Sequence, residues 1–158
     1  MLATEKHGYD LLVQLGKKEA NPLEVKVAIM RALTAFLDGN PDPLEPEGFM
    51  IILENLDSPK ETDEQKELVA ATLDCVLNCC VRHEQNRQNL VRNGLLDKVD
   101  AVLEAGGGGF EIRVARIWQA LVQDDDVRVP FGKAHDHARE IVEDHKALKQ
   151  LVKAINGR

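Results

Sequence analysis

The residues best suited to chemistry lie close together, where Asp124 to Asp126 are followed by His135 and His137. Two histidines two positions apart can chelate a metal ion from an extended loop. On a helix their side chains point about 200° apart and cannot share one ion. We favour a helix N-terminal turn in which these histidines cap or pack. A metal-binding or regulatory site in residues 124–137, with His135 and His137 as ligands, is kept as the alternative hypothesis.

The other reactive residues lack the partners that chemistry requires. After Asp124 there is no glycine at position six and no glutamate at position twelve of a calcium loop. Cys75, Cys79 and Cys80 fall on one predicted helix, without paired CxxC ligands or a positioned histidine. The run Gly106 to Gly109 is not followed by the lysine and hydroxyl residue of a phosphate loop. We therefore predict no catalytic residue, no cofactor and no metal, and a protein that is not an enzyme.

Composition indicates an all-α fold. The chain has 158 residues, of which 44% are hydrophobic, so it can bury a sizeable core. Only 4% are aromatic, which suits aliphatic helix-on-helix packing better than a β-sandwich. Long runs of alternating β-branched and aromatic residues are missing, so strands are not expected.

Charge and hydropathy narrow the partners and the compartment. The 27 acidic and 20 basic residues give a formal charge of −7, and no segment concentrates lysine or arginine. Nucleic-acid binding through counterion release needs such a basic patch, so it is not expected. There is no signal segment and no apolar run of membrane-spanning length, which predicts a soluble protein without membrane partners. Together with reduced cysteines, this favours the cytoplasm or the nucleus.

Hydrophobic periodicity predicts three amphipathic helices between Lys66 and Glu104, the second running from Gln88 to Asn93 and ending at Gly94. Each apolar stripe is too narrow to be buried alone, so neighbouring copies of the unit are required. The stripe of the first helix comprises Val69, Leu73, Val76, Leu77 and Cys80, and that of the third comprises Leu95, Leu96, Val99, Val102 and Leu103.

Irregular copies of the unit are found along the chain. Gly8, Gly48 and Gly94, spaced 40 and 46 residues apart, each precede or open a short apolar helix. Long helices are predicted over 21–37 and 110–123, and short ones over 9–18, 48–56 and 147–155. The long helix near Lys66 has two candidate capping boxes, one beginning at Ser58 and one at Thr62. An insertion is expected over 124–135.

These details together resemble an armadillo repeat: alanine in the middle of the long helix, Leu77-Asn78 near its end, then Asn86, and Gly94-Leu95 opening the next helix. The resemblance implies a right-handed α-solenoid of about three repeats plus partial terminal ones. Residues 1–158 would form a single domain, and we expect it to be part of a longer solenoid because the chain begins and ends within a repeat. Residues 124–152 also resemble the central region of one particular eukaryotic intracellular member of the family.

The resemblance also implies a binding surface. In armadillo proteins the long third helices line a concave groove that binds extended peptides, with a tryptophan four residues before an asparagine in the best-known members. This chain has one such asparagine and one such tryptophan, never on the same helix, which argues against nuclear-localisation-signal binding of the importin type. A constant offset of 44 residues carries the groove positions onto Met30, Thr34, Asp74, Asn78, Arg82, Trp118 and Val122.

We thus predict a non-enzymatic scaffold that binds a protein or peptide segment in this groove. Asp74 and the acidic total charge favour a basic partner. Two groove assignments have structural alternatives, since Trp118 suits a packed core position equally well and Asn78 suits a cap or an inter-repeat hydrogen bond. A further alternative is that the chain is purely a structural part of a longer solenoid.

Overall fold

The structure, a computed structural model, describes residues 2–18, 20–38, 45–82, 84–105 and 110–121. Across these ranges the regular elements are all α-helices and no strand is present, which confirms the predicted all-α class. The helices are α1 (Leu2–Gly16), α2 (Leu23–Asp38), α3 (Pro46–Leu56), α4 (Asp63–Arg82), α5 (Glu84–Arg92), α6 (Leu95–Glu104) and α7 (Glu111–Leu121). The predicted helix over 147–155 and the insertion over 124–135 lie outside the described residues.

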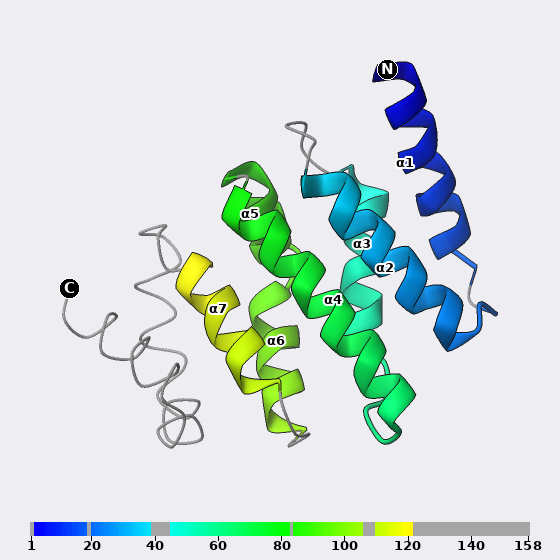
Figure 1. The fold of residues 1–158 in the computed structure, drawn as a ribbon. Coiled ribbons are helices and arrows are strands. Elements are labelled where there is room, and N and C mark those ends of the chain that lie inside the picture. The colour runs from blue at the N-terminus through cyan, green and yellow to red at the C-terminus, as the bar shows by residue number, and fades with distance from the viewer. Residues whose placement is uncertain (1, 19, 39–44, 83, 106–109, 122–158) are drawn as a thin grey trace.

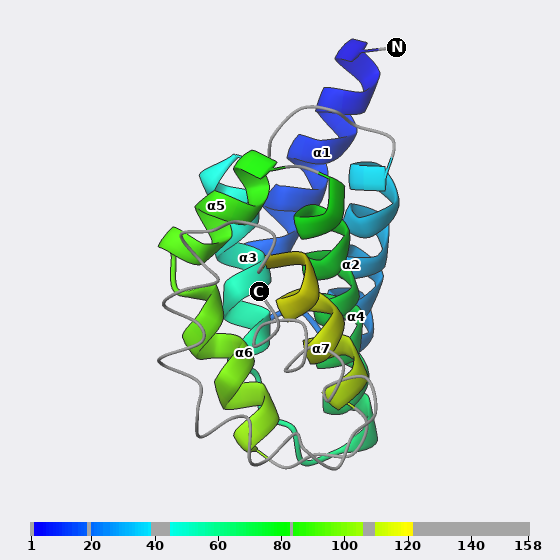
Figure 2. The same cartoon turned by 90° about the vertical axis from the view of Figure 1, so that its left-hand side faces the viewer.

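The helices stack as an α-solenoid with two layers (Figures 1 and 2). In one layer α4 lies between α2 and α7 and packs against both. In the other layer α3 lies between α1 and α6, and the short helix α5 links α4 to α6. The long helices therefore form the ladder expected of consecutive armadillo-type units. None of the described helices has the length and apolar character needed to cross a membrane.

The start of α4 is set by a reciprocal cap at Thr62. The backbone N–H of Gln65 donates to Thr62 Oγ1 at 3.1 Å, and the backbone N–H of Thr62 donates to Gln65 Oε1 at 3.1 Å. This capping box satisfies two amide groups that the first helical turn leaves without partners. Of the two candidate boxes, the structure therefore uses the one at Thr62, and the one at Ser58 stays in the connection from α3.

A buried stripe with the same spacing runs along each helix of the ladder. Its members are separated by three and then four residues, so they lie on one helix face. Side chains at these positions enter the shared core in every unit. The stripe therefore shows which residues of the three helices are equivalent. The stripe consists of Met30, Leu33 and Leu37 in α2, Leu73, Val76 and Cys80 in α4, and Val114, Ile117 and Leu121 in α7.

The glycines mark helix starts less regularly than predicted. Gly94 does precede α6 and has φ of 93°, the left-handed region that glycine adopts without penalty. Gly8 instead lies inside α1, and Gly48 lies in the first turn of α3. The prediction that Gly8 precedes a helix is therefore wrong, whereas the helix predicted from Gly48 begins two residues earlier, at Pro46. At α3 the start is provided by Pro46, whose fixed φ suits the first helical turn.

The conformation of Gly94 leads to a stability prediction. A Cβ at this position would meet no atom within 4 Å, so Gly94→Ala creates strain but no clash. The left-handed backbone should lower the free energy of unfolding by roughly 1–2 kcal/mol. Urea denaturation monitored by far-UV circular dichroism measures the change. Gly94→Asn should lose less, because asparagine tolerates this region better than alanine, and equal losses for both variants would contradict the backbone explanation.

Candidate partner-binding groove

Ion pairs connect neighbouring helices across the solvent-facing side of the ladder. Arg31 of α2 contacts Glu67 of α4 at 2.8 Å (N–O), and Arg113 of α7 contacts Asp74 of α4 at 3.0 Å (N–O). All four side chains are well exposed, so each pair contributes about 0–1 kcal/mol and is screened by salt. Their main effect is on the groove itself, where they neutralise Glu67 and Asp74 of α4.

A shallow hollow lies between these two ion pairs. Its volume is about 260 Å³, and its floor is made of small side chains, Ala70, Ala71 and Thr34. Two acidic and two basic residues surround that floor, which makes the hollow neutral. A floor of this kind lets an extended backbone approach the helices closely. We call it the central hollow, and it is lined by Arg31, Thr34, Glu67, Ala70, Ala71, Asp74 and Arg113.

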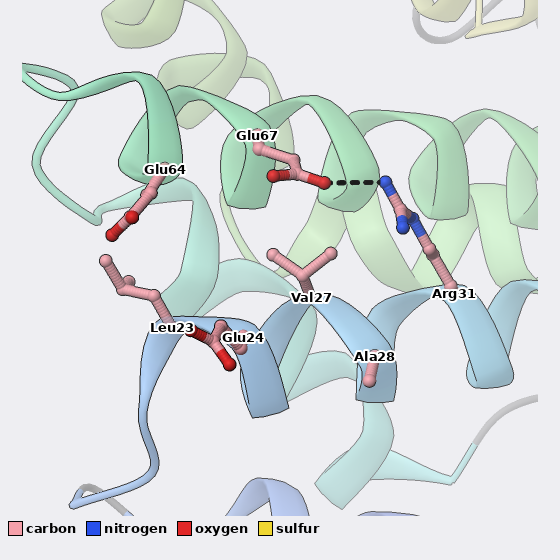
Figure 3. Close-up of a pocket in the computed structure, with 7 residues that line it drawn as sticks. All are labelled: Leu23, Glu24, Val27, Ala28, Arg31, Glu64 and Glu67. Carbon is pink, nitrogen blue, oxygen red and sulfur yellow. Dashed lines mark hydrogen bonds and ion pairs between the residues drawn. The ribbon is translucent and has the colours of Figure 1, made fainter.

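A second hollow, of about 300 Å³, opens between the N-terminal halves of α2 and α4 (Figure 3). In Figure 3, Glu67 reaches Arg31, whereas Glu24 and Glu64 lie toward the other end of the hollow. Within the described part of the chain, Glu24 and Glu64 form no ion pair, so their charges are uncompensated. Both lie in first helical turns, where a carboxylate also stabilises the helix dipole. We call this the acidic hollow, and Leu23, Glu24, Val27, Ala28, Arg31, Glu64 and Glu67 line it.

The structure corrects two of the predicted groove residues. Met30 is 0% exposed and Trp118 is 1% exposed, so neither presents its side chain on the concave face. The cause is the constant offset of 44 residues. When the helices are aligned by their buried stripes, Met30 matches Leu73 rather than Asp74, and Trp118 matches Leu77. Successive residues of a helix are about 100° apart around its axis. An alignment error of one residue therefore exchanges a groove position for a core position.

The other predicted groove residues have mixed outcomes. Asp74 is exposed on the ladder, and Thr34 and Asn78 are partly buried beside it. The side chain of Arg82 and all of Val122 lie outside the described residues. The same is true of His135 and His137, the ligands of the alternative metal site. Within the ranges that the structure describes, no three His, Cys, Asp or Glu residues are placed to hold a metal ion.

Asn78 is engaged between repeats. Its Nδ2 donates to the backbone oxygen of Thr34 at 3.3 Å, which ties α4 to α2. Its Oδ1 is buried and accepts no hydrogen bond from any residue that the structure describes. The inter-repeat alternative of the sequence prediction therefore describes Asn78 in this structure. An amide held in this way is not positioned to hydrogen-bond a peptide backbone.

The three cysteines of α4 are buried in the core. Cys75, Cys79 and Cys80 form no disulfide with any described residue and are at most 2% exposed. Hydrogen bonding to Cys75 and burial raise the pKa of the Cys79 thiol well above its ordinary value, so that thiol stays protonated. Since the thiolate is the nucleophile and the metal ligand, the protonated Cys79 acts as a small apolar packing group. Hydrogen bonding to Cys79 instead lowers the pKa of the Cys75 thiol, which is fully buried.

The sequence prediction missed five charged residues that surround the hollows. The sequence contains one signal for them, the spacing of seven residues between charged residues of the same helix. Residues seven apart lie two turns apart on the same helix face. Alignment by the buried stripes matches Glu24 with Glu67, and Arg31 with Asp74. That alignment depends on which residues are buried, and only the structure gives their burial. The missed residues are Glu24, Arg31, Glu64, Glu67 and Arg113.

Comparison with known proteins supports the resemblance. The chain is 33% identical over 159 aligned positions to Armadillo repeat-containing protein 6 of Homo sapiens and, equally, to that of Pongo abelii, covering 99% of this chain. The Armadillo repeat-containing protein 6 homolog of Drosophila melanogaster is 28% identical over 145 positions, covering 89% of this chain. The chain spans 31% of the length of each of these relatives. No family model matches, and no solved structure matches.

These relatives confirm that the chain resembles armadillo repeat proteins along nearly all of its residues. Armadillo repeat-containing protein 6 is also the family member that residues 124–152 resemble in sequence. The match covers nearly the whole of this chain rather than that segment alone.

Burial of Trp118 leads to a prediction that separates a core role from a groove role. Trp118→Ala should lower the free energy of unfolding by roughly 3–5 kcal/mol, because it empties a large volume beside α4. Gln119→Ala, one residue further on the exposed side of α7, should change it by less than about 0.5 kcal/mol. Chemical denaturation of both variants measures the difference. A small loss for Trp118→Ala would contradict the core assignment.

The Arg113–Asp74 pair should couple only weakly. A double-mutant cycle with Asp74→Asn and Arg113→Gln should give an interaction free energy below about 1 kcal/mol, since both groups are exposed. The coupling should vanish in 1 M salt, where charges are screened over about 3 Å. Coupling that persists at high salt would show that the pair has a packing role instead.

Proposed function

From the likeness of this chain to Armadillo repeat-containing protein 6, we propose that it is a non-enzymatic interaction scaffold whose groove along α2, α4 and α7 binds a protein segment. A solenoid presents its long helices as a continuous surface, and such surfaces bind extended segments in armadillo proteins. Three buried cysteines without a disulfide among the described residues suit a reducing compartment, so we place the protein in the cytoplasm or the nucleus.

The observation that carries this proposal is the adjacency of the two hollows. Both lie between α2 and α4, and Arg31 and Glu67 line both of them. A single extended segment that follows the seam between α2 and α4 therefore meets an acidic hollow and then a neutral one lined by small side chains. Concave surfaces with few but distinct polar groups are the usual form of a specific binding site.

The acidic hollow favours a basic side chain in the partner. It carries three carboxylates against one guanidinium, and Leu23, Val27 and Ala28 supply apolar surface beside them. The aliphatic stem of a lysine would lie on that apolar surface, with its ammonium group near Glu24 and Glu64. Asp74 contributes little to this preference for a basic partner, because Arg113 already compensates its charge.

A pull-down from eukaryotic cell extract tests the proposal. The bait is the 158-residue chain, as wild type and as the Glu24→Gln/Glu64→Gln variant, which keeps shape and removes both uncompensated charges. Partners of the groove should be recovered at least tenfold less with the variant, which corresponds to about 1.4 kcal/mol of binding free energy. Raising the salt concentration should reduce wild-type recovery in parallel.

The matched control is Glu54→Gln/Glu104→Gln, which removes two exposed charges from α3 and α6 in the other layer. It has the same net charge as the test variant and should retain the wild-type partners. Equal loss in both variants would indicate a non-specific charge effect. An unchanged partner list for Glu24→Gln/Glu64→Gln would rule out the acidic hollow as a binding element.

A further inference from the structure

The connection between α3 and α4 carries a serine whose side chain the fold does not use. Ser58 is the only serine in the sequence, and Pro59 and Lys60 follow it directly. The capping box of α4 forms at Thr62, so Ser58 does not cap that helix. Its backbone groups are engaged, but its hydroxyl forms no hydrogen bond with a residue that the structure describes. The hydroxyl is therefore available for a modification.

The backbone around Ser58 suits a protein kinase. Residues 57–62 lie between the two helices and form no helix or strand, and there Ser58 is half-buried and Pro59 is exposed. A residue before proline is restricted to extended conformations, the form in which kinases bind the acceptor and the residues after it. The backbone N–H of Ser58 donates to the oxygen of Asn55 at 3.3 Å. Opening such a bond in a short connection at the surface costs little free energy.

Two lysines surround the position that a phosphate on Ser58 would occupy. Lys60 Nζ donates to the backbone oxygen of Ser58 at 2.9 Å. Lys98 of α6 forms an ion pair with Asp57, the residue before Ser58. Burial lowers the pKa of Lys60, and the charge of Asp57 acts in the opposite direction. A second anion beside Asp57 would therefore gain charge-assisted hydrogen bonds from both ammonium groups.

We propose that Ser58 is a phosphorylation site for a proline-directed protein kinase, with Lys60 and Lys98 holding the phosphate. Such kinases require proline directly after the acceptor, and Ser58 is the only serine or threonine in the sequence that proline follows. The Oγ of Ser58 attacks the γ-phosphorus of ATP, the bond from that phosphorus to the bridging oxygen breaks, and ADP leaves. The hydroxyl proton passes to the catalytic aspartate of the kinase.

The modification would change how the two layers are tied together at this end. Phosphoserine carries a charge of about −1.5 to −2 near pH 7, so it would compete with Asp57 for Lys98. The phosphate would then fasten the α3–α4 connection to α6. This inference is independent of the groove and of its partner.

Phosphorylation of the folded 158-residue chain tests the acceptor. The chain is incubated with magnesium, ATP and an active mitogen-activated protein kinase, and its intact mass is measured. A single phosphate, about 80 Da, should be added to the wild type and to Ser58→Thr, and none to Ser58→Ala. Pro59→Ala keeps the serine and should be modified at least about tenfold more slowly. No phosphate on the wild type, a phosphate on Ser58→Ala, or an unchanged rate for Pro59→Ala would overturn the proposal.

Phosphorus NMR of the modified protein tests the two lysines. An ammonium group beside the phosphate favours its dianion, so the second pKa of the phosphoserine should be lower in the wild type than in Lys60→Gln or Lys98→Gln. Lys17→Gln is the matched control, because it also removes a lysine from an ion pair at the surface, with Glu47, and should leave that pKa unchanged. The same phosphate pKa in the wild type and in both lysine variants would show that these lysines do not hold the phosphate.

Discussion

The burial of α4 on both flanks is the constraint from which the rest of this structure follows. Leu68 and Cys75 are buried by α2, Leu73 and Val76 by the core between the layers, and Ala70 packs on the side of α7. A helix with apolar residues around most of its circumference is stable only inside a stack. The ladder is therefore a requirement of α4, and only a narrow strip of that helix remains available to a partner.

That strip determines the electrostatics of the groove. Glu67 and Asp74 lie on it two turns apart, and each meets an arginine from the neighbouring helix. The formal charge of −7 therefore does not describe the surface that a partner would meet at the middle of the ladder. Among the residues that line the two hollows, the carboxylates without an ion pair are Glu24 and Glu64. Two hollows that differ in charge but share residues give a surface on which the direction of a bound segment matters.

The relation between sequence and groove illustrates why a repeat is easier to recognise than to align. Hydrophobic spacing predicted every long helix of the ladder, since the core positions recur every three or four residues. The glycine-rich connection before α7 and the proline-containing connection after α2 set the offsets between helices, and loop lengths vary without changing the packing. A constant offset consequently placed Met30 and Trp118 in the groove, whereas both lie in the core.

The sequence by itself determined the helical class, the succession of long and short helices, the armadillo resemblance and the placement of the three cysteines on one helix. These depend on the residue types and spacing within one helix, where geometry is local. Only the tertiary structure decided which of the two caps starts α4, that Asn78 bridges repeats, and which charges meet across the ladder. Contacts between helices about forty residues apart depend on helix rotation, and a single residue of register changes that rotation by about 100°.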